Sequence, residues 1–253
     1  MPTITIDKRY CGPPNSANGG YVSGLLANSL DGTAEITLRA PPPLERELEL
    51  LRCADGTVEL RNTQGVLATG RKVSLDLVKV PSAGLAKATA AAARTAYADP
   101  STHPLPGCFV CGPGRAVGDG LRIFVGPLAA GVTGEIESVA APWIPTPDLV
   151  DDKGQVSCEF IWAALDCPSG FACQGAGQFQ VRGNKPILLG RMAAHIHRCP
   201  KPGDQCVIVA WSTGRDGRKL FSSSALLGCN GERLAIAQAT WLIVERKIQL
   251  GQS

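Results

Sequence analysis

The same order of predicted elements occurs twice along this chain of 253 residues, and that repetition limits its fold more than any single motif does. In the first half, residues 18–30 predict a helix and residues 34–78 predict four strands after it. In the second half, residues 158–166 predict a helix and residues 186–247 predict four longer strands. A helix and an antiparallel meander that occur twice predict two similar units, packed together as a pseudo-dimer.

Tight turns divide the two series of strands at matching places. Asp55-Gly56 lies between the second and third predicted strands of the first series, and Asp216-Gly217 lies between the second and third of the second series. An Asp-Gly pair between alternating segments is a strong signal for a short hairpin turn. The matching positions therefore support the interpretation of a repeated unit.

The two predicted units are joined by a connector of different composition. Residues 83–98 are rich in alanine and predict a helix, whereas residues 99–114 contain too much Pro and Gly for regular structure. Residues 120–128 and 131–140 predict the first strands of the second unit. We therefore expect an N-terminal unit over residues 1–82, a connector over 83–107 and a C-terminal unit over 108–253.

Composition and charge narrow the classes of partner. Hydrophobic residues make up 44% of the chain and charged residues 19%, which supports well-packed cores. The net charge of +3 is small and dispersed, so we expect neither a nucleic-acid partner nor a membrane partner, but a small molecule. The first residues lack the basic and apolar regions of a signal peptide, and no apolar run approaches about 18 residues. We expect a cytoplasmic protein.

Ten cysteines would suggest disulfides in a small secreted protein, but five of them are notable for occurring singly within apolar segments, as small core residues do. These single cysteines are Cys53, Cys158, Cys173, Cys206 and Cys229. Cys108 and Cys111 form the only C-x-x-C pair. A structural zinc site needs a second pair of ligands, and neither another C-x-x-C nor an H-x-x-x-H follows. We expect no metal and no other cofactor, and a metal or redox role for Cys108 and Cys111 is the remaining alternative.

Four stretches resemble the double hotdog fold of the acyl-CoA thioesterase superfamily, including its phenylacetate-type members. They are NGGYVSGLLA (18–27), CFVCGPGRAVGDGLRI (108–123), WAALDCPSGFA (162–172), and the last two predicted strands, DGRKLFSSSALL with LAIAQATWLIV (216–227 and 234–244). The resemblance implies an α+β fold in which two long antiparallel sheets each wrap around a central helix. It also implies hydrolysis of a thioester of coenzyme A or of an acyl carrier.

Thioester hydrolysis requires donors for the charge that develops on the carbonyl oxygen, and a carboxylate that attacks or activates water. Asn18, Gly19 and Gly20 begin the first predicted helix, where unpaired N–H groups can approach such an oxygen. Either Ser16 or Asn18 can cap this helix. A tight turn with an ordinary cap is the alternative interpretation of the same residues.

Asp166 is the candidate acid. Helical spacing places it opposite the apolar stripe of the second predicted helix, on a face that it shares with Glu159, Trp162 and Ala163. A face with Trp and Ala beside its acid is expected to be half-buried against the other helix, and partial burial raises the pKa of a carboxyl group. Pro168 predicts that the helix ends or kinks just beyond Asp166, or that a new short helix begins there, capped by Asp166 or Cys167.

The two helices show complementary losses when they are compared in register. In relatives that begin this helix with His-Gly-Gly, the acid comes nine residues after the His. Asp166 comes nine residues after Ser157, but Ser-Cys-Glu replaces the donor turn. The first helix keeps the Gly-Gly turn after Asn18, but its ninth following residue is Ala27. We therefore expect one complete site, with the turn of one half facing the acid of the other. Whether Asn18 donates directly or only fixes the turn stays open.

Five further residues are candidates for substrate binding. Tyr21 and Trp162 can line an acyl pocket, Ser169 can help Asp166 to orient water, and Arg218 and Lys219 can meet the phosphates of coenzyme A. Core packing, turn chemistry and solvated charges are the respective alternatives. The alternative function is a non-catalytic module that binds an acyl thioester or coenzyme A. A dehydratase is disfavoured because neither predicted central helix contains a His. Association of several chains into a homo-oligomer is also expected to be possible.

Overall fold

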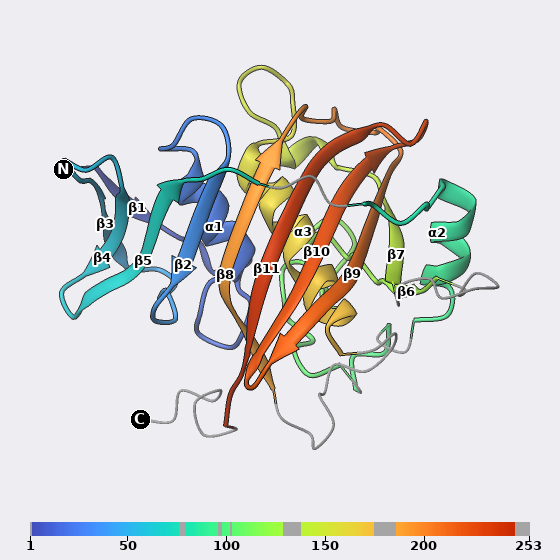
Figure 1. Cartoon of the computed structure of the whole chain (residues 1–253), viewed down its shortest axis with the longest axis horizontal. Coiled ribbons are helices and arrows are strands. Elements are labelled where there is room, and N and C mark those ends of the chain that lie inside the picture. Colours follow the sequence, from blue (N-terminus) through green and yellow to red (C-terminus); the bar gives the residue numbers. More distant parts are fainter. Residues whose placement is uncertain are drawn as a thin grey trace.

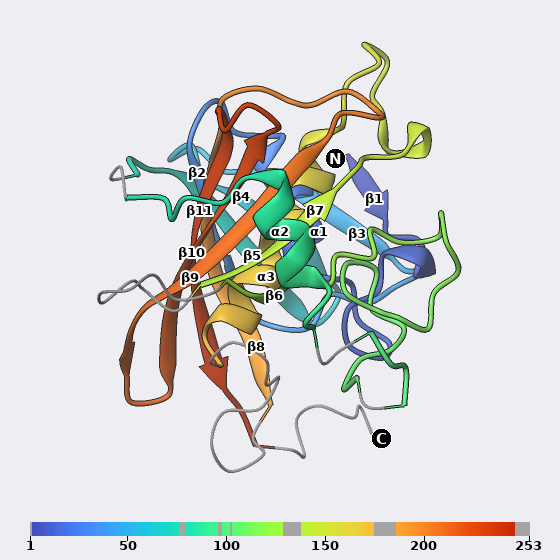
Figure 2. The ribbon, with the colours of Figure 1, turned by 90° about the vertical axis from the view of Figure 1, so that its right-hand side faces the viewer.

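The computed structural model describes residues 2–75, 79–95, 98–101, 103–128, 138–174 and 186–245. In this part of the chain, one antiparallel sheet of eleven strands packs against two central helices (Figure 1 and Figure 2). The three α-helices found there are α1 (Gly19–Ala27), α2 (Leu85–Ala92) and α3 (Cys158–Ala172). The strands are β1 (Thr3–Thr5), β2 (Ala34–Leu38), β3 (Glu47–Arg52), β4 (Val58–Asn62), β5 (Gly65–Lys72), β6 (Gly126–Pro127), β7 (Ser138–Trp143), β8 (Ile187–Ile196), β9 (Cys206–Asp216), β10 (Lys219–Gly228) and β11 (Arg233–Ile243).

The strand order confirms the repeat that the sequence predicts. It runs β1-β3-β4-β5-β2-β8-β11-β10-β9-β7-β6, and β2 pairs antiparallel with β8 at the centre. From the central pair outward, the order is β2, β5, β4, β3 on one side and β8, β11, β10, β9 on the other. On both sides this is the first, fourth, third and second strand that follows the central helix of that half. The two predicted sheets are therefore continuous with each other, and the α+β double arrangement is confirmed.

The predicted hairpins are also present. Gly56 lies in the turn between β3 and β4 with φ of 81°, and Gly217 lies between β9 and β10 with φ of 55°. Both angles fall in the left-handed region, which glycine adopts without the steric cost that a Cβ atom brings. The Asp-Gly pairs thus match the backbone that the turns require.

The C-terminal strands are buried on both faces. Ile208 and Ala210 of β9 face the main core, which also contains α1 and α3. Val207, Val209 and Trp211 alternate with them and belong to a second apolar cluster, which includes the alanines of α2. The Ala-rich connector helix thus covers the outer face of the sheet at this end. This explains why β9 reads as a continuous apolar run rather than as an alternating one.

The two central helices lie antiparallel and unusually close, because glycines of α1 face α3. A Cβ atom on Gly20 would lie 2.4 Å from Asp166 Cβ, and one on Gly24 would lie 2.3 Å from Glu159 Cα. Both distances are too short for real side chains. Gly20 therefore has a packing function in addition to any function at the helix N-terminus.

The prediction that the second helix ends near Pro168 is wrong, as is the alternative of a new helix capped by Asp166 or Cys167, whereas a kink at Pro168 stays a prediction. The helix α3 continues through Pro168 to Ala172. Proline removes a backbone donor from the helix interior. Two serine hydroxyl groups donate in this turn: Ser224 Oγ to Leu165 O at 2.9 Å, and Ser169 Oγ to Asp166 O at 2.8 Å. The carbonyl that loses its helical donor to Pro168 is that of Ala164. The two hydroxyl groups, one of them on β10, bond to the next two carbonyls of this turn.

Other element boundaries differ from the sequence predictions. The strands predicted at 34–44 and 186–204 stop at Leu38 and Ile196, before their proline-bearing turns, and the strand predicted at 120–128 is reduced to β6. Residues 76–78, 131–137 and 246–247 of three other predicted strands lie outside the described residues. Within the described residues, none of the helices has the length and apolar character needed to cross a bilayer.

Candidate active site

The N-terminus of α1 and the middle of α3 meet through polar atoms. Asn18 caps α1, since its Oδ1 accepts from the N–H of Tyr21 at 2.9 Å. The Nδ2 of the same side chain donates to Asp166 Oδ2 at 2.9 Å, and the N–H of Gly20 donates to that oxygen at 3.0 Å. Asn18 thus both fixes the turn and contacts the acid directly. The structure brings together Asn18, Gly20 and Asp166 from the two halves.

Asp166 is more deeply buried than half-burial against a neighbouring helix would make it. Only 2% of its surface is exposed, and its Oδ1 atom makes no hydrogen bond with any residue that the structure describes. Burial raises the pKa of this carboxyl group to about 7, although the hydrogen bonds from Gly20 and Asn18 lower it. The negative charge of a Cys108 thiolate also raises it. The predicted direction of the pKa shift is therefore confirmed.

The reciprocal position has a different structure. Ser157 occupies the cap position of α3, but its side chain makes no capping hydrogen bond. Glu159, which corresponds to Gly20, accepts from Asn28 Nδ2 at 3.0 Å in an exposed contact. Ala27 corresponds to Asp166 and offers no polar group. One composite arrangement of donor turn and buried acid is therefore present, and its counterpart is an exposed amide and carboxylate.

The other candidates lie in packed surroundings or at the surface. Gly19 begins α1, and its carbonyl group accepts from Ser23 Oγ at 2.8 Å. Tyr21 is buried and stacks on Tyr10, with ring centroids 4.2 Å apart. Trp162 is also buried, with its backbone carbonyl near Gly20. Aromatic packing thus surrounds the start of α1.

The hydrogen bonds described for Ser169 do not involve the Asp166 carboxylate, and the two basic candidates lie at the surface. Ser169 donates to the backbone oxygen of Asp166 and accepts from Trp241 Nε1 at 2.9 Å. Its hydroxyl group therefore contacts the backbone of α3 and not the acid side chain. Arg218 and Lys219 are exposed at the hairpin between β9 and β10.

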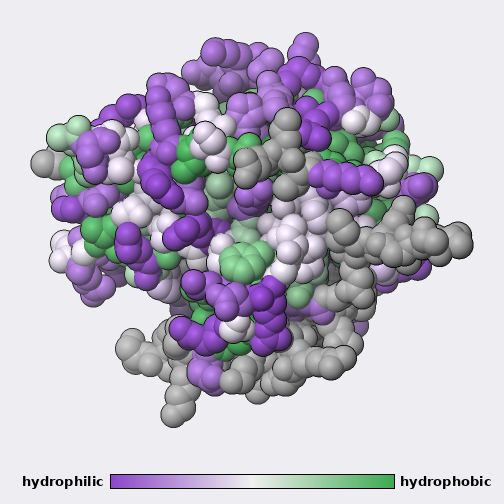
Figure 3. Space-filling model, viewed as in Figure 1, coloured by the Kyte–Doolittle hydropathy of each residue, from purple (hydrophilic) through white to green (hydrophobic). Residues whose placement is uncertain are grey.

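A hollow of about 380 Å³ lies on the outer face of the sheet, away from these residues. Figure 3 shows pale, weakly polar residues gathered near the middle of this face, among hydrophilic ones. Its walls include Glu35, Arg191, Thr213, Phe221 and Gln238. It is not lined by Asp166 or Asn18, so it does not extend the composite site.

Three cysteines lie beside Asp166, and the sequence did not identify one of them, Cys167, as part of this group. The sulfur atoms of Cys108, Cys111 and Cys167 all lie within 4.8 Å of one another, and all three residues are buried. Asn18 Nδ2 approaches Cys167 Sγ at 3.9 Å. Cys167 was considered only as a helix cap. The signal available in the sequence was its position next to the candidate acid.

The single cysteines do not all behave as isolated core residues. Cys206 is buried in β9, as predicted, whereas Cys229 is exposed just beyond β10. Cys158 Sγ lies 3.9 Å from Cys199 Sγ, so it is not isolated. The prediction of core cysteines is therefore wrong for Cys229, and it is met only in part by Cys53, Cys158 and Cys173, which are half-buried.

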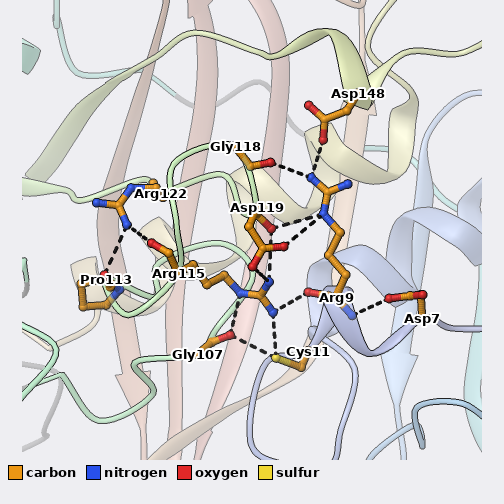
Figure 4. Close-up of polar contacts among 10 residues, drawn as sticks. All are labelled: Asp7, Arg9, Cys11, Gly107, Pro113, Arg115, Gly118, Asp119, Arg122 and Asp148. Carbon is orange, nitrogen blue, oxygen red and sulfur yellow. Dashed lines mark hydrogen bonds and ion pairs between the residues drawn. The ribbon is translucent and has the colours of Figure 1, made fainter.

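Arginines hold the C-x-x-C segment against the N-terminal segment (Figure 4). Arg115 donates through Nε to Gly107 O at 2.8 Å and through Nη2 to Arg9 O at 2.6 Å. Arg9 donates to Gly118 O at 3.1 Å and forms an ion pair with Asp148. Several of these bonds end on backbone carbonyl groups, so they fix the course of the loop.

No protein-family model matches the sequence, and no curated protein matches it. Solved structures do match, over 96% of this chain and 92% of each of the three that follow. The acyl-CoA thioesterase II TesB2 of Mycobacterium marinum has a TM-score of 0.62 at 12% identity. The tesB protein of Mycobacterium avium subspecies paratuberculosis has 0.60 at 12%, and a protein of unknown function with a hot dog fold from Alicyclobacillus acidocaldarius has 0.54 at 10%.

These matches define the class of the fold. The chain has the hotdog fold in its double form, as the resemblance of its four sequence stretches implied. Over nearly its full length it is similar to solved structures of thioesterase II type. The sequence identity is only 12%, so this similarity shows the fold alone.

Proposed function

We propose that this protein is a thioesterase that hydrolyses a thioester of coenzyme A or of an acyl carrier. The observation that supports it most is the double contact of one buried carboxylate: Asp166 Oδ2 accepts from both Gly20 and Asn18 of the other half. These donors hold one oxygen and leave Oδ1 without a hydrogen-bonding partner among the described residues. An acid that is positioned through one oxygen can act on water, or on the thioester carbon, through the other.

In this proposal the N-terminus of α1 stabilises the carbonyl oxygen. The N–H groups of Gly20 and Tyr21 already donate to Asp166 and Asn18, so the proposed donor is the N–H of Gly19, at the positive end of the helix dipole. Gly20 packs against α3 and holds Asp166 in place. Tyr21, Trp162 and Ser169 support the site by packing, and Arg218 and Lys219, exposed at a hairpin, are proposed contacts for the phosphates of coenzyme A.

A second candidate function is a module of the same fold that binds an acyl thioester or coenzyme A without turnover. The observation that favours it is the burial of Asp166, which is 2% exposed and lines no part of the hollow described above. In this case the acid is a structural residue that links α1 to α3.

Free-thiol release from a panel of short, long and aromatic acyl-CoA thioesters separates the two functions. The comparison is between the native protein, Asp166→Asn and the control Glu159→Gln, at matched thermal stability. We expect the native protein and the control to turn over at least one substrate, and Asp166→Asn to lose about 100-fold or more in rate. Native protein that releases no thiol, yet is stabilised against heat by coenzyme A, would instead support the binding module.

We also propose that residues 1–82 and 108–253 are the two hotdog units, and that the protein works in the cytoplasm. The continuity of each strand set around its own central helix supports the division. The ten cysteines all lie in the described part of the chain and none forms a disulfide there, which fits a reducing compartment.

A further inference from the structure

The three buried sulfur atoms beside Asp166 form a compact triangle. Cys108 and Cys111 come from the loop that precedes β6, and Cys167 comes from the middle of α3. Their exposed fractions are 1%, 0% and 6%, and the sulfur atoms of Cys108 and Cys167 are 3.8 Å apart. Two sulfur atoms at this distance also fit a simple thiol contact. The third sulfur, within 4.8 Å of both, makes the group a potential metal-binding set.

The spacing suits a tetrahedral ion. Zinc–sulfur bonds of about 2.3 Å place neighbouring thiolates of a tetrahedron about 3.8 Å apart. The separation of Cys108 and Cys167 already has this value. The other two separations are at most 4.8 Å, so the sulfur atoms need to approach one another by no more than about 1 Å to bind one ion.

The surroundings of Cys108 favour a thiolate. The backbone N–H groups of Val110 and Cys111 donate to its sulfur, and donors of this kind stabilise a thiolate. Metal ions bind cysteine in the thiolate form. Gly112 keeps this turn tight, since a Cβ there would lie 2.4 Å from Cys108 O.

The Asp166 carboxylate is a neighbour of this set and not a member of it. Asp166 precedes Cys167 on α3, but its carboxylate oxygens do not lie within 4.8 Å of all three sulfur atoms. Asn18 Nδ2 contacts both Asp166 Oδ2 and Cys167 Sγ, so the carboxylate and the thiol share one neighbour. The arginine contacts of Figure 4 hold the loop that supplies the other two sulfurs.

We propose that Cys108, Cys111 and Cys167 bind one zinc ion as thiolates, with water in the fourth position. Binding replaces the thiol protons, which pass to solvent, and requires no oxidant. The ion offsets two of the three thiolate charges, and it ties the C-x-x-C loop to the central helix. The proposal does not depend on thioesterase activity, because it concerns an ion that is measured without substrate.

The test measures metal directly. The full chain is purified under reducing conditions without a metal-affinity tag, its zinc content is determined by elemental analysis, and the metal-free protein is titrated with Co²⁺. We expect about one zinc ion per chain, and a Co²⁺ spectrum with thiolate charge-transfer bands and the strong ligand-field bands of a tetrahedral site. These two measurements use the native protein only, so they hold even if the variants fold poorly.

The matched variants are Cys167→Ser and Cys229→Ser. Loss of an outer-shell partner alone weakens metal sites by about 10-fold to 100-fold, so loss of the direct ligand Cys167 is expected to weaken Zn²⁺ binding by at least ~100-fold. Cys229 is exposed and is not one of the three proposed ligands, so we expect Cys229→Ser to keep its full zinc content. A native protein with no zinc, no Co²⁺ charge-transfer band and no rise in Tm with Zn²⁺ would overturn the proposal, as would a disulfide among the three cysteines in reduced preparations.

Discussion

The N-termini of the two central helices are related by the internal repeat, yet they differ in every polar contact. At the start of α1, Asn18 and Gly20 surround a buried carboxylate that belongs to α3. At the start of α3, Ser157 makes no cap, and Glu159 meets Asn28 in an exposed contact. The sheet repeats its strand order on both sides of the β2–β8 seam. The two halves therefore share the course of their backbone, whereas the polar residues at their helix starts differ.

The same asymmetry is visible in packing. Gly20 and Gly24 of α1 correspond in register to Glu159 and Ala163 of α3. The glycines give α3 the room that its own side chains need, because a Cβ on either would overlap atoms of α3. The two helices can therefore pack this closely only because α1 has glycine at the positions that contact α3.

The largest expected effect on stability comes from adding a methyl group at Gly24. Its Cβ would lie 2.3 Å from Glu159 Cα, so backbone must move, and we expect Gly24→Ala to lower the free energy of unfolding by about 3 kcal/mol. Helix propensity alone would raise it by about 1 kcal/mol. The matched change on the other helix, Ala163→Gly, should cost about 2 kcal/mol, because it lowers helix propensity and removes one buried methyl group. Chemical denaturation of both variants measures the difference, and equal losses would contradict the one-sided contact.

A smaller effect is expected at the two cap positions. Asn18→Ala removes a cap and one partner of Asp166, and we expect a loss of about 2 kcal/mol in the free energy of unfolding. Ser157→Ala removes no side-chain cap, so its effect should stay within about 0.5 kcal/mol. Urea titrations of the two proteins test this, and a costly Ser157→Ala would show that the second helix start is capped in solution.

The smallest effect concerns the exposed amide and carboxylate. A double-mutant cycle between Asn28 and Glu159 should give a coupling energy below about 0.5 kcal/mol, because solvent competes for the contact. The corresponding cycle between Asn18 and Asp166 should give about 1.5 kcal/mol or more, since that hydrogen bond is buried and involves an ionisable group. Similar values from the two cycles would remove the distinction between the two helix starts.

Much of this architecture follows from sequence, because hydrophobic periodicity and turn residues are local signals. The order of elements, the Asp-Gly hairpins and the pairing of the Asn18 turn with Asp166 were all predictable in register. The continuation of α3 through Pro168 was not, since one of the hydroxyl groups that satisfies its carbonyls, Ser224 Oγ, comes from a distant strand. Cys167 was missed as a neighbour of the C-x-x-C pair for the same reason: the distance between two segments is a property of the folded chain.

The two ends of the sheet have a consequence for how molecules of this protein meet one another. Its outermost strands in the described residues are β1, with three residues, and β6, with two, one of which is Pro127. Strands this short, one of them lacking a backbone donor, are poor templates for a further strand. In the part of the chain that the structure describes, these two outermost strands therefore offer few backbone groups to a second copy, and we expect contacts between copies to form through faces of the sheet or through loops.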